Sequence, residues 1–347
     1  MSILKSEVLM LLSEVVSDEA TNGGRMDNNN SVISGSSNNV WDSVFKDERD
    51  IGSRKYRKTF FKIANDDNNE YFNPKIWLDI VTPADDWVIF FAGSQTDLQG
   101  VSGAGITGTD AYGCGVLTSN VLSGVSSVTV TVEDDSLATG ADAIFRDGGT
   151  IRIFNKDTPD SGIGTQEIHV INGTPSVSGS EVTLTLTGTL ANAYNTDDNV
   201  YGTRIASVYE PDNIVGSFDS FVDTTAGDGT YDDVASPVIV DSIGAIEQTV
   251  TITFTDSINF TAVSNVAGVT LSGGSKGVDY SPQNDDVSKP YFTLLAIGFA
   301  DTWAQDDTIV FTTHPASSAI WQVRVVPALA NSVNGNRTIP TISGEGV

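Results

Sequence analysis

The sequence is poor in the residues that build covalent or metal-bound cores. It has one cysteine, Cys114, and two histidines, His169 and His314, among 347 residues. A single thiol cannot form an intramolecular disulfide, so the disulfide framework of small secreted domains is excluded. The two histidines fall in different predicted domains and do not provide a conventional zinc cage. We therefore expect no metal site and no cofactor.

Long hydrophobic runs are also missing. An apolar stretch near the start, Val8 to Leu12, is bracketed by Glu7 and Glu14, and no small-residue cleavage site follows it. This pattern does not fit a secretory signal, and no window of about eighteen uncharged apolar residues is present to span a membrane. We expect the chain to fold in a reducing cytoplasm, without membrane insertion.

Positive charge is scarce. Eighteen lysines and arginines stand against 45 aspartates and glutamates, which gives a formal net charge of −27. Such a surface repels nucleic-acid phosphates and anionic membranes, so no direct nucleic-acid binding is expected. Ten of the eighteen basic residues precede residue 76, and none occurs between 76 and 145 or between 205 and 275. The sequence thus joins a basic N-terminal segment to an acidic remainder.

Seven basic residues crowd into seventeen positions of that segment. They are Lys46, Arg49, Arg54, Lys55, Arg57, Lys58 and Lys62. Because complementary charges on separate surfaces bring molecules together, we expect these residues to make subunit contacts with an acidic face of a second copy. The alternative is that they neutralise carboxylates of their own chain.

No catalytic motif is present, and the chain is predicted not to be an enzyme. The sequence lacks a Gly-x-Ser-x-Gly elbow, and its paired aspartates fall at predicted turns, where such side chains usually bond their own backbone. Two turns rich in Asp and Asn, at 65–68 and 228–233, carry the oxygen ligands that calcium prefers. Neither turn matches an EF-hand pattern, so calcium binding stays open.

What the sequence does have is Gly, Ser, Thr, Asn, Asp and Val, which favour strands and turns over helices. Short alternating apolar stretches recur from Tyr56 to Val326. These features predict an all-β chain: an antiparallel Ig-like β-sandwich interrupted by a second small β-barrel or β-sandwich domain, with an extended N-terminal arm.

The predicted boundaries divide the chain into four segments. They are an N-terminal helix and arm at 1–54, the first part of the sandwich at 55–115, an inserted β-domain at 116–212 and the second part of the sandwich at 213–347. Within the first segment we expect a helix over 3–16 and an irregular arm over 17–54. We favour an inserted domain because the three strands predicted in 55–115 would rarely bury enough surface to be stable on their own. Three contiguous domains are the alternative.

Several short motifs, taken in order, resemble a family of virion proteins in Mu-like tailed bacteriophages. They are Asn22-Gly-Gly-Arg-Met26, Asn38-Asn-Val-Trp41, Lys55-Tyr-Arg-Lys58, Ala64-Asn-Asp-Asp67, Thr82-Pro-Ala-Asp-Asp86, Asp147-Gly-Gly-Thr-Ile-Arg-Ile153, Thr183-Leu-Thr-Leu-Thr-Gly188, Val323-Arg-Val-Val-Pro-Ala328 and Ser343-Gly-Glu345. The resemblance covers both ends of the chain and extends into the middle block. No single motif is specific; their order carries the likeness.

The resemblance implies a structural role among the head and tail proteins of the virion. The long arm rich in Asn, Asp and Gly suits assembly as a homo-oligomer, so we expect a non-enzymatic component of the tail tube or baseplate whose copies meet through the arm and the sheet edges. Partners would then be copies of the chain itself and other virion proteins. A neck or capsid-decoration protein is the alternative within this class, and a carbohydrate-binding adhesin that meets host glycans is the alternative outside it. Exposed indoles at Trp41, Trp303 or Trp321 would favour the adhesin, whereas burial of all three would favour assembly.

Overall fold

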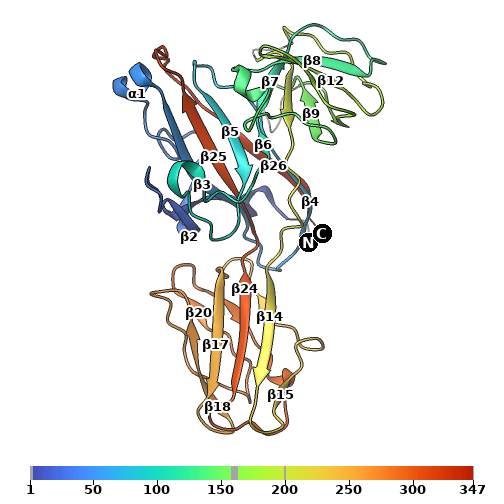
Figure 1. Ribbon diagram of the computed structural model, residues 1–347. Helices are drawn as coiled ribbons and strands as arrows, with labels where there is room; N and C mark the ends of the chain where they lie inside the picture. Colours follow the sequence, from blue (N-terminus) through green and yellow to red (C-terminus); the bar gives the residue numbers. More distant parts are fainter. Residues whose placement is uncertain (1–2, 158–162, 199–200, 347) are drawn as a thin grey trace.

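The computed structural model describes residues 3–157, 163–198 and 201–346 (Figure 1). It confirms an all-β chain of antiparallel sandwich type, with 42% strand and 5% helix. The strands form three bodies, which we call the central body, the middle body and the far body. Among the described residues, no helix has the length and apolar character needed to cross a lipid bilayer.

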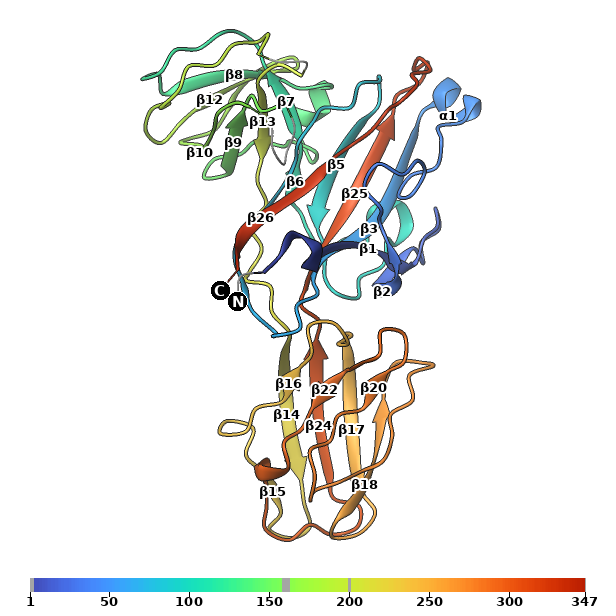
Figure 2. The ribbon, with the colours of Figure 1, turned by 180° about the vertical axis from the view of Figure 1, so that it is seen from behind.

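The central body is built from both ends of the chain (Figures 1 and 2). Its six-stranded sheet runs in the order β2 (Gly23–Ser31), β1 (Val8–Val15), β3 (Ser53–Ile63), β25 (Ser317–Val326), β5 (Trp87–Ala92), β6 (Ala111–Tyr112). A second layer pairs β4 (Tyr71–Leu78) with β26 (Pro340–Gly346). Short helices complete it: η1 (Lys5–Glu7), α1 (Lys46–Ile51) and η2 (Val101–Gly103). A strand from the last tenth of the chain thus lies between two strands from its first third.

Strands β3 and β25 are buried on both faces. Trp321 and Val323 pack with Ile89 in one apolar cluster, and Ile320 packs with Phe90 in another on the opposite face. Alternation along β25 therefore places Trp321 and Val323 in a core, but it does not leave the other face of the strand in water. Gln322 and Arg324 on that other face are buried as well.

The middle body is a seven-stranded curled sheet. Its order is β10 (Gln166–Val170), β9 (Thr150–Phe154), β13 (Arg204–Ser207), β7 (Cys114–Leu117), β8 (Ser127–Thr131), β12 (Glu181–Thr185), β11 (Ser176–Ser178), with η3 at Asp135–Leu137. An isolated bridge from Ile171 to Leu186 brings its two sides together, yet the described strands do not close into a barrel. The body shares one apolar cluster with Trp321 and Tyr56 of the central sheet.

The far body has a sheet and a core of its own. The sheet order is β14 (Ser217–Thr224), β24 (Thr308–His314), β17 (Gln248–Phe254), β18 (Asn259–Ser264), β19 (Gly274–Ser275). The facing layer contains β15 (Thr230–Tyr231), β16 (Ile239–Val240), β20 (Gln283–Asn284), β21 (Lys289–Pro290), β22 (Phe292–Thr293), η4 (Ala296–Gly298) and β23 (Phe299–Ala300). The core is rich in aromatic rings; Trp303, for example, stacks on Phe254 with centroids 4.3 Å apart.

Two expectations about the first 54 residues are wrong. The predicted helix over 3–16 is a 3-10 turn followed by strand β1, because the apolar residues from Leu9 to Leu12 are enclosed between two neighbouring strands. The predicted arm over 17–54 contains β2 and α1; residues 17–22 form the turn that leads into β2, and the longer irregular stretch is residues 32–45. Trp41 fixes the end of that irregular stretch, since its ring lies between the guanidinium groups of Arg57 and Arg324.

The predicted second part of the sandwich, 213–347, also differs from the structure. Residues 217–314 form the far body with its separate core, and only β25 and β26 return to the central body. The sequence pattern did not separate these roles, because alternating strands look alike whichever sheet they join.

Candidate functional site

The basic cluster lies on β3 and α1, and most of it is covered by its own chain. Lys58 is fully buried; its Nζ lies 2.6 Å from Asp97 Oδ1 and donates to the carbonyl oxygen of Gly24. Burial alone would raise the pKa of Asp97, but its hydrogen bond from Lys58 holds that pKa below the usual range. The two groups therefore form a buried ion pair, in which Asp97 also accepts from the indole of Trp321.

Three further members of the cluster pair with carboxylates of the same chain. Arg54 forms a two-pronged contact with Asp142 of the middle body, at 2.6 and 3.0 Å. Lys55 lies 3.0 Å from Asp18 and 2.9 Å from Glu48, and Arg57 lies 2.8 Å from Asp18. These residues tie segments of one molecule together.

The subunit-contact prediction is therefore wrong for Arg57, Lys58 and Lys62, whose side chains have almost no surface to offer another molecule. Lys62 instead donates to Asn28 and to the carbonyl of Ile243 in the far body. Lys46 and Arg49 on α1 remain accessible, although Lys46 pairs with Asp50 and Arg49 bonds the carbonyl of Val44. Intrachain neutralisation accounts for most of the cluster.

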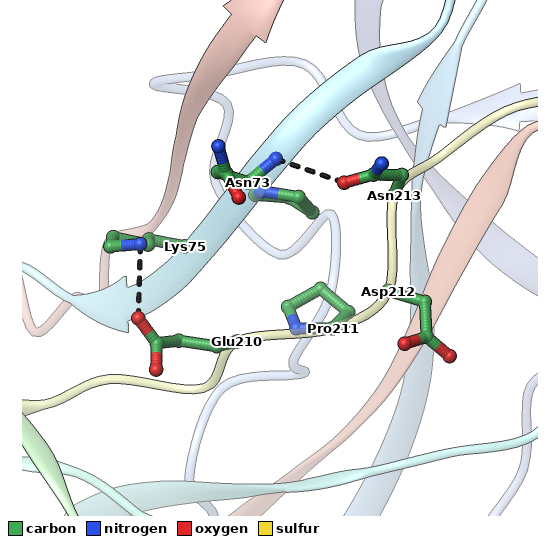
Figure 3. A pocket seen from close by; sticks show the side chains of 7 residues that line it. Asn73, Lys75, Glu210, Pro211, Asp212 and Asn213 are labelled. Carbon is green, nitrogen blue, oxygen red and sulfur yellow. Dashed lines mark hydrogen bonds and ion pairs between the residues drawn. The ribbon is translucent and has the colours of Figure 1, made fainter.

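A polar pocket lies where β4 meets the linker between the middle and far bodies (Figure 3). Tyr71 bonds Ile214 at one end of this pairing and Ile76 bonds Tyr209 at the other, while the chain segments between them separate. The lining residues are Asn73, Pro74, Lys75, Glu210, Pro211, Asp212 and Asn213.

The polar groups of this pocket largely satisfy one another. Lys75 Nζ lies 2.9 Å from Glu210, and the backbone amide of Asn73 donates to Asn213 Oδ1 at 3.1 Å (Figure 3). The lining includes no histidine, cysteine, serine or aromatic ring. The lining thus offers no aromatic surface on which a sugar ring could stack, and Lys75 and Glu210 are engaged with each other.

The histidines are bound to carboxylates. His169 lies 2.8 Å from Glu167, which also accepts the backbone amides of Ala191 and Asn192. His314 lies 2.8 Å from Glu247 through Nδ1 and 3.3 Å from Asp219 through Nε2. Glu247 accepts a hydrogen bond from the imidazole of His314, and this contact raises the pKa of His314 above its usual value, which favours the protonated form.

The candidate calcium turns are occupied by structural hydrogen bonds. In the first, Asn65 accepts the amides of Asp67 and Asn69, and Asp66 pairs with Lys289. In the second, Asp232 accepts the amides of Val234 and Ala235. No group of three or more metal-ligating side chains is found in the part of the chain that the structure describes.

The three indoles named as possible platforms are mostly enclosed. Trp303 and Trp321 are buried and offer no ring face to a sugar. Trp41 is half-buried, and the guanidinium groups of Arg57 and Arg324 lie 5.4 and 5.0 Å from the centre of its ring.

A surface that the sequence did not single out lies at the end of the central sheet. Phe45, Ile51 and Leu329 are 64%, 80% and 84% exposed. The first two flank α1, and the amide of Leu329 bonds the carbonyl of Arg49 on the same helix. Figure 1 shows α1 beside the end of β25. We call these three residues the apolar tip; no periodic signal marks them, because they lie at the ends of a six-residue helix and in a separate loop rather than along one face of a long element.

Comparison with known proteins gives no assignment. No protein-family model, no curated protein and no solved structure matches the chain.

Proposed function

We propose that the chain is a non-enzymatic structural component of a tailed-phage virion, in the tail tube or baseplate, and that it assembles as a homo-oligomer. The proposal rests on the ordered motifs described above and on one structural observation, the apolar tip.

The apolar tip carries the assembly part of the proposal. Three highly exposed large apolar side chains gather on and beside the short helix α1, and apolar groups collected on one part of a surface are characteristic of sites that another molecule covers. Leu329 adopts a φ of 65°, a conformation that a branched side chain rarely takes without surrounding constraints. The adjoining arm adds another exposed apolar side chain, Ile33.

The sheet edges are less suited to make the main contact. Strand β1 pairs with the edge strand β2 through two register shifts, and β14 pairs with β24 through another. Bulges of this kind bend an edge strand and protect it from pairing with a foreign strand. We therefore assign the main subunit contact to the apolar tip and the arm rather than to the edges.

Two measurements test this function. Purified virions with a label at the C-terminus of this chain should show the label at the tail under the electron microscope. A label at the neck or over the capsid would replace the tail role with the neck or decoration role. An unlabelled virion would contradict the whole proposal.

The second measurement concerns the contact itself. Native mass spectrometry of the purified chain should detect oligomers that Ile51→Asp with Leu329→Asp removes. Ile297→Asp is the matched control, since Ile297 is also 84% exposed but lies on the far body. Equal oligomer populations in the tip variant and the control would rule out the apolar tip as the contact.

The burial of Trp303 and Trp321 weighs against the adhesin, since two of the three indoles have no ring face available for a sugar. Binding of the purified chain to a glycan array would reverse this preference.

A further inference from the structure

The far body and the rest of the molecule have no apolar core in common. All members of the far body's cluster come from its own residues, from Phe218 to Phe311. The middle body behaves differently: its Val130 and Leu184 share a cluster with Trp321, and its Arg152 stacks on Trp77 of β4 at 4.0 Å. Two bodies are therefore joined by a continuous core, whereas the third is not.

The chain enters and leaves the far body at adjacent points. Entry is at Ile214, which bonds Tyr71, and exit is at Ala316, whose carbonyl accepts the amide of Ile63 at 2.8 Å. These four residues form one small apolar cluster. Figure 2 shows the two connections running side by side between the bodies. Two neighbouring connections of this kind leave rotation about their common anchor open.

Away from that anchor, one loop of the far body makes two polar contacts with the central body. This clasp loop comprises residues 241–244. The amide of Ser242 donates to Asn68 Oδ1 at 2.7 Å, and the carbonyl of Ile243 accepts from Lys62 Nζ. Inside the loop, Asp241 accepts the amides of Ile243 and Gly244, which fixes its shape.

Two polar contacts flank the clasp loop. Arg25 Nε donates to the carbonyl of Glu247 at 2.8 Å, and Lys289 Nζ lies 2.6 Å from Asp66. The second pair is exposed to solvent, so salt screens it. Water can replace every one of these four contacts when the loop moves away, because each joins polar groups only.

We infer that the far body is an articulated module, anchored at Ile214 and Ala316 and fastened by the clasp loop, which opens and closes against a rigid unit of central and middle bodies. Contacts between polar groups are weak in net terms, whereas a shared apolar core is strong, so motion concentrates at the polar joint. The joint acts in this way whether or not the chain assembles.

Single-molecule Förster resonance energy transfer between two dyes tests this motion. Dyes are attached at Leu122→Cys in the middle body and Ile297→Cys in the far body, both highly exposed positions. The native Cys114 is buried and does not compete for the dye. The variant Arg25→Ala, Asn68→Ala, Lys289→Ala removes three of the four polar contacts while leaving both cores intact. We expect it to broaden the distance distribution and to populate a second, undocked state.

Amide exchange supplies a second readout at the joint. Loss of the Asn68 acceptor should speed exchange of the Ser242 amide by roughly fivefold or more, the factor that one net hydrogen bond of about 1 kcal/mol gives. Raising the salt to about 1 M should act in the same direction, because the Lys289 pair is screened.

The matched control is Lys75→Ala with Lys276→Ala. Lys75 pairs with Glu210 next to the anchor, and Lys276 bonds the carbonyl of Asp301 within the far body, so neither touches the clasp loop. Its distances and exchange rates should match those of the wild type. An unchanged distance distribution together with unchanged Ser242 exchange in the triple variant would show that the joint is rigid and overturn the inference.

Discussion

Lys58 and Lys62 lie four residues apart on β3, and both are buried, yet their surroundings differ in charge. Lys58 meets the carboxylate of Asp97, whereas Lys62 meets only neutral oxygens, from Asn28 and Ile243. Burial lowers the pKa of Lys62 to about 8, with partial compensation from the charge of Asp241. A neutral amine still has two N–H donors for its two acceptors, so deprotonation keeps both hydrogen bonds.

This shift makes stability depend on pH in a defined direction. Between about pH 8 and pH 10.5 the unfolded chain holds a proton on Lys62 that the folded chain has released, so the free energy of unfolding should rise with pH there. The gain should approach about 3 kcal/mol across the window. Urea unfolding of the wild type and of Lys62→Met at several pH values measures it. A difference between the two proteins that stays constant or falls from pH 8 to 10.5 would contradict the assignment.

Trp321 combines apolar burial with a polar contact. It is fully enclosed, packs in the cluster shared by the central and middle bodies, and donates to Asp97 at 3.0 Å. Trp321→Ala should lower the free energy of unfolding by about 3–5 kcal/mol, because it leaves a large cavity. Chemical denaturation measures the change. A loss below about 1 kcal/mol would mean that the ring lies in water instead.

At the scale of the element, β3 explains why the basic cluster was misjudged. A central strand enclosed by layers on both sides buries every residue along much of its length, and here the basic side chains reach carboxylates and carbonyls of β2 and the neighbouring loops. The sequence alone showed seven basic residues within a short segment. It gave no sign that Asp18 and Asp97, far away along the chain, would come to lie beside Arg57 and Lys58.

Charge-reversal variants test whether the basic residues of β3 are buried or accessible. Arg57→Glu with Lys58→Glu should prevent folding or cost several kcal/mol, since removing one partner of a buried pair alone costs about 3–5 kcal/mol. Lys46→Glu with Arg49→Glu, on the accessible helix α1, should change stability by no more than about 1 kcal/mol. Thermal unfolding of both double variants makes the comparison. Similar melting temperatures for the two would contradict the buried placement of Arg57 and Lys58.

Strands with only one face in a core could be predicted from the sequence, whereas the first strand could not. The strict alternation of Val128, Val130 and Val132, or of Val250, Ile252 and Phe254, identified strands because one face of each meets a core. The stretch from Val8 to Val15 has apolar residues at both helical and strand spacings, so periodicity did not distinguish them. Its strand conformation comes from its neighbours: β1 pairs with β3 on one side and β2 on the other.

At the scale of the molecule, the far body has its own apolar core but lacks most of the positive charge that holds it to the central body. The far body, residues 214–316, carries fourteen carboxylates and two lysines, and both lysines are already engaged, by Asp66 and by the carbonyl of Asp301. Its attachment to the central body therefore depends on basic groups from outside, Arg25 and Lys62, together with Lys289. Part of the basic segment that the sequence shows is thus used to hold an acidic module in place.

The separate core of the far body predicts that it can be excised. Its two ends are neighbours, since Ser217 pairs with His314 across β14 and β24, and its cluster needs no residue from outside. A fragment of residues 213–316 should therefore fold alone, with a cooperative thermal transition and ordered near-ultraviolet signals from Trp303. The middle body, residues 113–208, should fail the same test, because Trp321, Val323 and Tyr56 of the central sheet complete its core. If 113–208 folded alone and 213–316 did not, the division into one rigid pair and one independent module would be wrong.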